Sequence, residues 1–156
     1  MNINVVLYLL ITSVVVLNGC ASQPDASGTN DGNKGGLLMV HGEMICREVF
    51  TNKMWQFKKK GPFSSQEAAE HYASELKIGG YDDWRLPSRS ELFDIFYMHY
   101  FQNHGDCEMN YRGDFWSLSK DKGPSLGHWE DYLLCGPEFK FVDSMKDYGF
   151  VRAIRP

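Results

Sequence analysis

The segment Gly80–Leu92, with the sequence GYDDWRLPSRSEL, constrains the fold of this chain more than any other part of it. Pro87 disfavours helical backbone at the residue before it, so the chain reaches this point in an extended form. Ser88 and Glu91 then have the spacing of a capping box, in which the two side chains bond free amides at the start of a helix. This pattern predicts a helix that begins after Ser88 and runs to about Tyr100.

Large apolar side chains surround this helix start. Trp84 and Leu86 come just before it and are expected to point into the core. Within the helix, one set of apolar residues shares one face and a second set shares another: Leu92, Ile95 and Phe96, and then Phe93, Tyr97 and Tyr100. Because both faces carry large apolar surface, we expect the helix to be packed on both.

A second capping pattern predicts a helix earlier in the chain. Ser64 and Glu67 have capping-box spacing, and the helix is expected to run from about Ser65 to Lys77. Apolar residues recur there at three- and four-residue spacing: Ala68, Ala69, Tyr72, Ala73 and Leu76. The pair Gly79-Gly80 is expected to end this helix in the left-handed conformation that glycine favours.

Strand-like segments lie on both sides of the two helices. They are 37–40, 43–50 and 54–57 before the helices, and 115–119, 129–134, 139–142 and 149–155 after them. Residues 58–62, with the sequence KKKGP, combine charge with turn residues and are interpreted as a solvated loop. Residues 101–113 are interpreted as a long loop. Strands, then helices, then strands predict an α+β fold.

The first 36 residues have the features of an export and anchoring segment. The apolar run 5–17 is shorter than the roughly 20 residues that a membrane-spanning helix requires. It leads to Leu17-Asn18-Gly19-Cys20, which resembles the bacterial lipobox, so residues 1–19 are predicted to be a signal peptide and Cys20 to be lipidated. Residues 20–36 are rich in Ser, Gly, Asn and Asp and are predicted to be a flexible tether. The folded domain is then 37–156.

The residues after the lipobox and the charge balance indicate where the protein works. Ala21 and Ser22 follow Cys20 in place of aspartate, which in Gram-negative lipoproteins indicates sorting to the outer membrane. We therefore expect a location in the bacterial cell envelope, with membrane contact through the lipid on Cys20. The chain has 16 Lys and Arg against 20 Asp and Glu, and this acidic balance argues against nucleic acid as a partner.

Several motifs together resemble the DUF1566 family, also called the Lcl C-terminal domain. The residues that carry the resemblance are Trp55, Asp83, Trp84, Arg85, Leu86, Pro87, Ser88, Glu91, Leu92, Trp116, Ser117 and Arg152. The family looks like a branch of the C-type-lectin-like superfamily. The resemblance implies two helices packed on small antiparallel sheets, with the N- and C-terminal strands adjacent. It also implies an adhesion or carbohydrate-recognition module at the cell surface.

Three cysteines remain after Cys20, and the resemblance bears on how they pair. The resemblance implies a bridge between positions that match Ala73 and Ala153 here, and with alanine at both positions that bridge is absent. Cys107 and Cys135 lie where C-type-lectin-like domains often have a second bridge, and they are the expected pair. Cys46 is then a buried free thiol, or the partner of one of the other two.

The sequence favours binding over catalysis. His99, His104 and Cys107 cluster in the central loop, with His128 beyond it, but no spacing typical of a metal site or a catalytic motif occurs, so no catalytic residue, metal or cofactor is assigned. The candidate ligand-binding residues are Tyr111, Arg112, Trp129 and Tyr132, because aromatic rings can stack on sugar faces or anchor a protein interface.

The prediction is therefore a lipid-anchored envelope module for binding or adhesion that recognises a glycan or an envelope protein. A small periplasmic enzyme or metal-binding protein that uses the His/Cys loop is one alternative. A purely structural envelope lipoprotein is the other.

Overall fold

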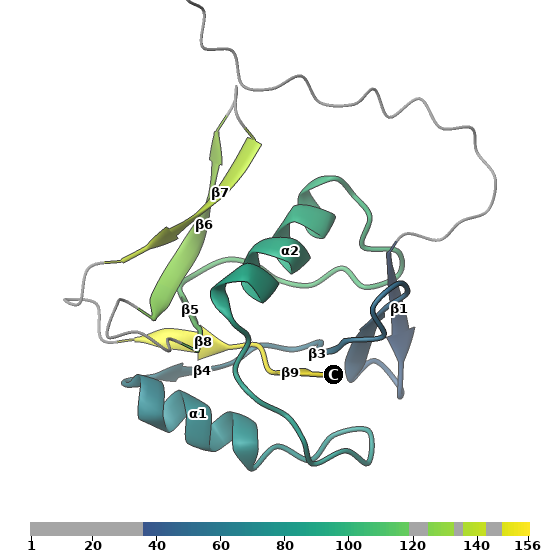
Figure 1. The fold of residues 1–156 in the computed structure, drawn as a ribbon, viewed down its shortest axis with the longest axis horizontal. Coiled ribbons are helices and arrows are strands. Elements are labelled where there is room, and N and C mark those ends of the chain that lie inside the picture. The colour runs from purple at the N-terminus through teal and green to yellow at the C-terminus, as the bar shows by residue number, and fades with distance from the viewer. Residues whose placement is uncertain (1–35, 119–124, 133–135, 143–147) are drawn as a thin grey trace, which may run out of the picture.

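The structure is a computed structural model, and it describes residues 36–118, 125–132, 136–142 and 148–156. The predicted signal peptide, Cys20, most of the tether and Cys135 lie outside the described residues. The elements are β1 (Leu37–Val40), β2 (Ile45–Glu48), β3 (Met54–Gln56), β4 (Lys60–Phe63), α1 (Gln66–Ser74), α2 (Arg89–Tyr100), β5 (Phe115–Trp116), β6 (Leu126–Tyr132), β7 (Gly136–Phe141), β8 (Gly149–Val151) and β9 (Ile154–Arg155). The two helices and the strands form an α+β fold, as the sequence predicts (Figure 1).

The strands form two sheets. The first has the order β1-β2-β3-β9 and is antiparallel, and the second has the order β4-β8-β5-β6-β7. The second sheet is mixed, because β5 and β8 run parallel. The last strand joins the N-terminal sheet by pairing with β3, and β1 lies at the opposite edge. The expectation that the N- and C-terminal strands are adjacent is therefore wrong, because β2 and β3 lie between them.

The C-terminal segment and the lysine-rich segment differ from the sequence expectation. Residues 149–155 are predicted as one strand, but β8 and β9 belong to different sheets and Arg152 and Ala153 lie between them. Residues 60–63 form the exposed strand β4, which pairs with β8, although a loop is predicted over part of this range. Pro62 is compatible with this strand because β4 lies at the edge of its sheet, where a missing amide leaves no ladder bond broken.

Helix α1 begins one residue later than predicted and ends three residues earlier. Ser65, and not Ser64, caps it, since the Ser65 hydroxyl accepts from the Ala68 amide at 3.1 Å. Gly79 and Gly80 do adopt positive φ, of 63° and 82°, but they form a turn that brings Ile78 beside Tyr81 and do not cap the helix.

Helix α2 has the predicted bounds, and its capping box is confirmed. The Glu91 amide donates to the Ser88 hydroxyl at 3.2 Å, and the Ser88 amide donates to the Glu91 carboxylate at 2.8 Å. The face with Leu92, Ile95 and Phe96 is buried.

The expectation that α2 is packed on both faces is wrong. Phe93, Tyr97 and Tyr100 remain 40%, 44% and 37% exposed. These rings contact their neighbours along the helix, as the 5.7 Å between the Phe93 and Tyr97 centroids shows, and only part of this face meets the hairpin.

The residues that carry the resemblance to the Lcl C-terminal domain have structural roles in this fold. The apolar members are buried: Trp55, Trp84, Leu86, Pro87, Leu92 and Trp116. Arg85 forms two hydrogen bonds of 2.8 Å to the Glu91 carboxylate, so that the α2 cap and an ion pair share one acid. Asp83 accepts from Arg155 at 2.5 and 3.0 Å and joins the loop before α2 to β9. The Ser117 hydroxyl donates to a backbone carbonyl at 3.0 Å.

Candidate functional site

An open groove lies between the C-terminal end of α2, the loop that follows it and the β6–β7 hairpin. Its volume is about 1080 Å³, slightly above the usual range for small-ligand pockets, which is roughly 300–1,000 Å³. In Figure 1 the hairpin extends from the rest of the fold beside α2. The aromatic and imidazole side chains that line the groove are His99, Tyr100, His104, Tyr111, His128 and Trp129.

One wall of the groove consists of α2 and the following loop. Tyr111 is only 8% exposed, and its ring contacts Phe96 and His99 with centroid distances of 4.7 and 4.3 Å. The ring of His104 lies 5.3 Å from that of His99. Burial raises the pKa of Tyr111, so its hydroxyl keeps its proton at neutral pH. Burial, with His104 close by, lowers the pKa of His99, which favours its neutral form.

Three polar atoms in this wall lack a partner within the described residues. They are the Tyr111 hydroxyl and the Nδ1 atoms of His99 and His104, and each is buried. Buried polar groups in folded proteins are nearly always hydrogen-bonded, so three such atoms beside one groove distinguish this wall from the rest of the core.

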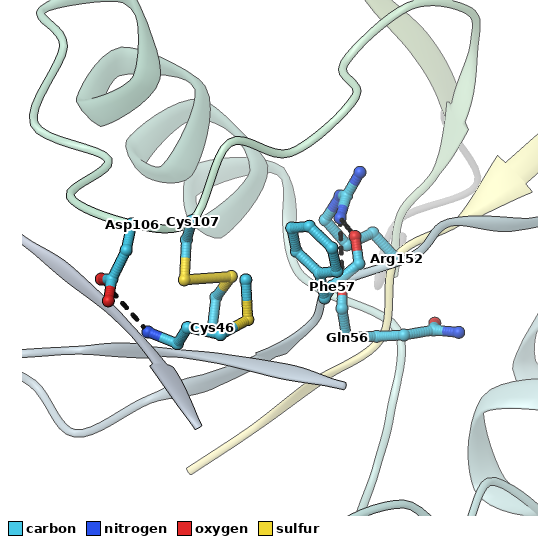
Figure 2. The surroundings of a disulfide bond; sticks show 7 residues. Cys46, Gln56, Phe57, Asp106, Cys107 and Arg152 are labelled. Atoms are coloured by element: carbon cyan, nitrogen blue, oxygen red, sulfur yellow. Dashed lines mark hydrogen bonds between the residues drawn. A yellow bond between two sulfur atoms is a disulfide. The ribbon is translucent and has the colours of Figure 1, made fainter. Parts of the chain in front are cut away.

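A disulfide holds the middle of this loop. Cys107 is bonded to Cys46 on β2, with Cα atoms 5.9 Å apart, and Figure 2 shows the bridge from the loop to the sheet. Beside it, the Met39 amide donates to the Asp106 carboxylate at 3.4 Å. The expected bridge between Cys107 and Cys135 is therefore wrong, because the fold places β2 directly against the loop. The alternative, that Cys46 pairs with another cysteine, is confirmed.

Arg152 holds the same loop at Asn110. Its side chain is fully buried, and its guanidinium donates to the carbonyls of Gln56, at 2.9 Å, of Phe57, and of Asn110, at 2.7 Å. Figure 2 shows the guanidinium beside Phe57. Burial lowers the pKa of Arg152 to about 10, so it remains charged at pH 7 beneath the Tyr111 ring. The buried Arg152 cation thus connects the end of β3 to the loop that forms this wall of the groove.

The opposite wall is the β6–β7 hairpin. Trp129 packs across Phe96 with ring centroids 4.7 Å apart, and this contact joins the hairpin to α2. Side chains of alternate residues on β6 form a row of hydrogen bonds. The His128 Nδ1 lies 2.9 Å from the Asp114 carboxylate, and the His128 Nε2 lies 3.1 Å from the Glu130 carboxylate. The Tyr132 hydroxyl donates to Glu130 at 2.5 Å, and this bond, with those from His128 and Lys140, lowers the pKa of Glu130 to about 2.

The structure brings together most of the residues that the sequence suggests for binding. Tyr111, Arg112 and Trp129 line the groove. Tyr132 does not line it, and its hydroxyl donates to Glu130. The histidines proposed for chemistry, His99, His104 and His128, line the same groove, but Cys107 is buried in the disulfide.

Sequence reasoning misses Tyr100, Glu108 and Asp114 as lining residues. It also misses Arg152 as the support of the groove wall. Only its position between the apolar residues Val151 and Ala153 could have indicated that role.

The charged side chains that line the groove nearly balance. Arg112 is the one formal cation in the lining, against the carboxylates of Glu108 and Asp114, and Asp114 is already bonded to His128. The backbone of Arg112 is held by Lys59 and Asn110, while its guanidinium is exposed. The groove therefore offers polar and aromatic contacts without a strong net field.

Comparison of the sequence with family models, with curated proteins and with solved structures gives no match. The resemblance to the Lcl C-terminal domain and to C-type lectins therefore stays a prediction from the motifs.

Two properties of the described residues complete the description of the site. Neither helix in the described part of the chain has the length and hydropathy needed to cross a membrane. Within 36–118, 125–132, 136–142 and 148–156, no group of three His, Cys, Asp or Glu side chains could hold a metal ion.

Proposed function

We propose that this chain is a lipid-anchored module of the bacterial cell envelope that binds a saccharide in the groove between the α2 wall and the β6–β7 hairpin. The observation that carries the proposal is the groove lining, which combines aromatic rings with three polar atoms that have no partner within the described residues. Sugars present apolar ring faces and hydroxyl groups together, and a site that binds them needs both kinds of contact.

Exposed aromatic rings extend this surface beyond the groove. Tyr100 lines the groove and also belongs to the outward face of α2, where Phe93 and Tyr97 are exposed. Exposed aromatic residues of this kind commonly mark binding surfaces. A saccharide of several units could thus occupy the groove and continue along the helix.

The alternative of a small enzyme that uses the His/Cys loop has less support. A cysteine nucleophile acts as a thiolate, and the sulfur of Cys107 is bonded to Cys46. The three histidines of the groove remain, but without that nucleophile they have no evident reaction to assist.

A binding assay tests the proposal. The full chain, purified in detergent, is titrated by calorimetry with maltohexaose, chitohexaose and hexagalacturonic acid. We expect saturable binding of at least one hexasaccharide. Binding of none of the three would contradict the proposal and favour the purely structural role.

The lipid anchor needs a separate test. In a Gram-negative host grown with labelled palmitate, the chain should incorporate label and a Cys20→Ser variant should not. Equal labelling of the two, or no labelling of the original chain, would contradict an anchor at Cys20.

A further inference from the structure

Unpartnered buried polar atoms concentrate at the groove. In the described part of the chain, six buried side-chain nitrogen or oxygen atoms have no hydrogen-bond partner. Three of them belong to groove-lining residues, namely His99, His104 and Tyr111, and a fourth is the Nε of Arg152, whose guanidinium lies 5.4 Å from the Tyr111 ring centroid. The remaining two, on Arg47 and Trp84, belong to residues that do not line it.

Such atoms destabilise the free protein. A polar group that leaves water without finding a partner loses its hydration and gains nothing in return. A sequence under no other constraint would place phenylalanine at position 111, because the Tyr111 ring is 92% buried among aromatic side chains and its hydroxyl bonds to nothing within the described residues. Buried polar groups without a hydrogen-bond partner are retained in proteins mainly at functional sites.

We propose that the Tyr111 hydroxyl and the Nδ1 atoms of His99 and His104 are the selectivity determinants of the groove, and that they bind hydroxyl groups of an uncharged saccharide. This inference rests on the proposed function. A sugar hydroxyl can donate one hydrogen bond and accept others, so it can satisfy the tyrosine hydroxyl and either tautomer of an imidazole. A carboxylate can only accept, and therefore cannot satisfy an imidazole nitrogen that itself needs a donor.

The charge of the lining agrees with an uncharged ligand. Arg112 shares the lining with two carboxylates, Glu108 and Asp114, so the lining offers no cluster of cations for an anionic sugar. The Arg152 cation is occupied by three backbone carbonyls beneath the wall. Burial keeps His99 in its neutral form, which leaves one of its nitrogens as an acceptor.

Binding requires a small adjustment of this wall. The three atoms are covered in the free protein, although their residues line the groove. His104 lies in the turn that follows α2, between α2 and the disulfide at Cys107, where a side-chain rotation does not disturb a helix or a strand. Rotation of the imidazole rings would bring their nitrogens to a ligand and leave the backbone of the loop in place.

The test compares Tyr111→Phe with the matched control Tyr148→Phe. Tyr148 is 66% exposed and does not line the groove. Tyr111→Phe removes the unpartnered hydroxyl, so we expect the melting temperature of the free chain to rise by roughly 2–6 °C. The same variant should bind the neutral hexasaccharides maltohexaose or chitohexaose about 3- to 10-fold more weakly. Tyr148→Phe should change neither quantity.

The outcomes separate this inference from the proposed function. If the original chain binds none of the hexasaccharides, the proposed function fails and the inference fails with it. If it binds them but Tyr111→Phe binds equally well, only the inference is overturned. A fall in the melting temperature of Tyr111→Phe overturns it too, since the hydroxyl would then have a partner in the free protein. Tighter binding of hexagalacturonic acid than of both neutral sugars overturns the assignment of an uncharged ligand.

Discussion

Removal of the Cys46–Cys107 disulfide should destabilise the domain strongly. The two cysteines are 61 residues apart in sequence, so the bridge closes a long loop in the unfolded chain. The loop-entropy relation gives roughly 14 cal/mol/K for a loop of this length, or about 4 kcal/mol at 25 °C. A domain of ordinary stability has only about 5–15 kcal/mol in total, so a large part of it depends on this bond.

The perturbation is the double variant Cys46→Ala with Cys107→Ala, and the assay is urea unfolding followed by tryptophan fluorescence. We expect the free energy of unfolding to fall by about 2–4 kcal/mol, because measured disulfide contributions often lie below the entropic value. Cys135→Ala is the matched control. It leaves the Cys46–Cys107 bridge intact and should leave the free energy unchanged.

Two results would refute this reasoning. A loss below about 1 kcal/mol in the double variant would mean that the loop is held in place without the bridge. A comparable loss in Cys135→Ala would mean that Cys135 belongs to the bridge after all. Peptide mapping under non-reducing conditions gives the same answer independently, because it should recover Cys46 linked to Cys107.

Two further predictions concern buried charges. Glu91→Gln should reduce the free energy of unfolding at pH 7 by about 2 kcal/mol. The hydrogen bonds from Arg85 and from the helix cap lower the pKa of Glu91 from 4.5 to about 2, which corresponds to about 3 kcal/mol. Because the Arg85 side chain is 39% exposed, solvent screening reduces this value. Because the pKa of Glu91 is lower in the folded state than in the unfolded state, this stabilisation is complete above about pH 4.5 and is lost as the pH falls toward 2. The melting temperatures of the variant and the original chain should therefore converge in acid. A difference that stays constant with pH would contradict the assignment. Arg152→Met should reduce the free energy of unfolding by about 3–5 kcal/mol, because it leaves three buried carbonyls without their donor. It should also weaken saccharide binding, because the loop at Asn110 loses its support. Unchanged stability in urea unfolding would show that these bonds do not hold the loop.

The parts of the fold that could be predicted are those that local sequence determines. Ser88 and Glu91 are three residues apart and complete their hydrogen bonds within one turn, so the start of α2 follows from the sequence alone. Strand β4 was missed because Gly61 and Pro62 disfavour a strand locally, and only its position at the edge of the second sheet permits it.

The candidate site could be predicted in its residue types but not in its arrangement. The sequence predicts Tyr111 and Trp129 as candidate ligand-binding aromatics, yet the groove also needs the hairpin to lie beside α2, which depends on contacts far apart in the sequence. The pairing of Cys107 depends on the same kind of contact, since the fold places β2 against a loop 61 residues further along the chain. Sequence distance gives no guide to such a pairing.

The most direct measurement is photo-crosslinking of the full chain with a chitohexaose that carries a diazirine, followed by peptide mapping. If the groove is the saccharide site, the label should lie on peptides that contain residues 99–114 and 128–129, and an excess of unlabelled chitohexaose should remove it. Label that excess chitohexaose displaces only from peptides outside the groove would contradict the central claim, and so would the absence of any displaceable label.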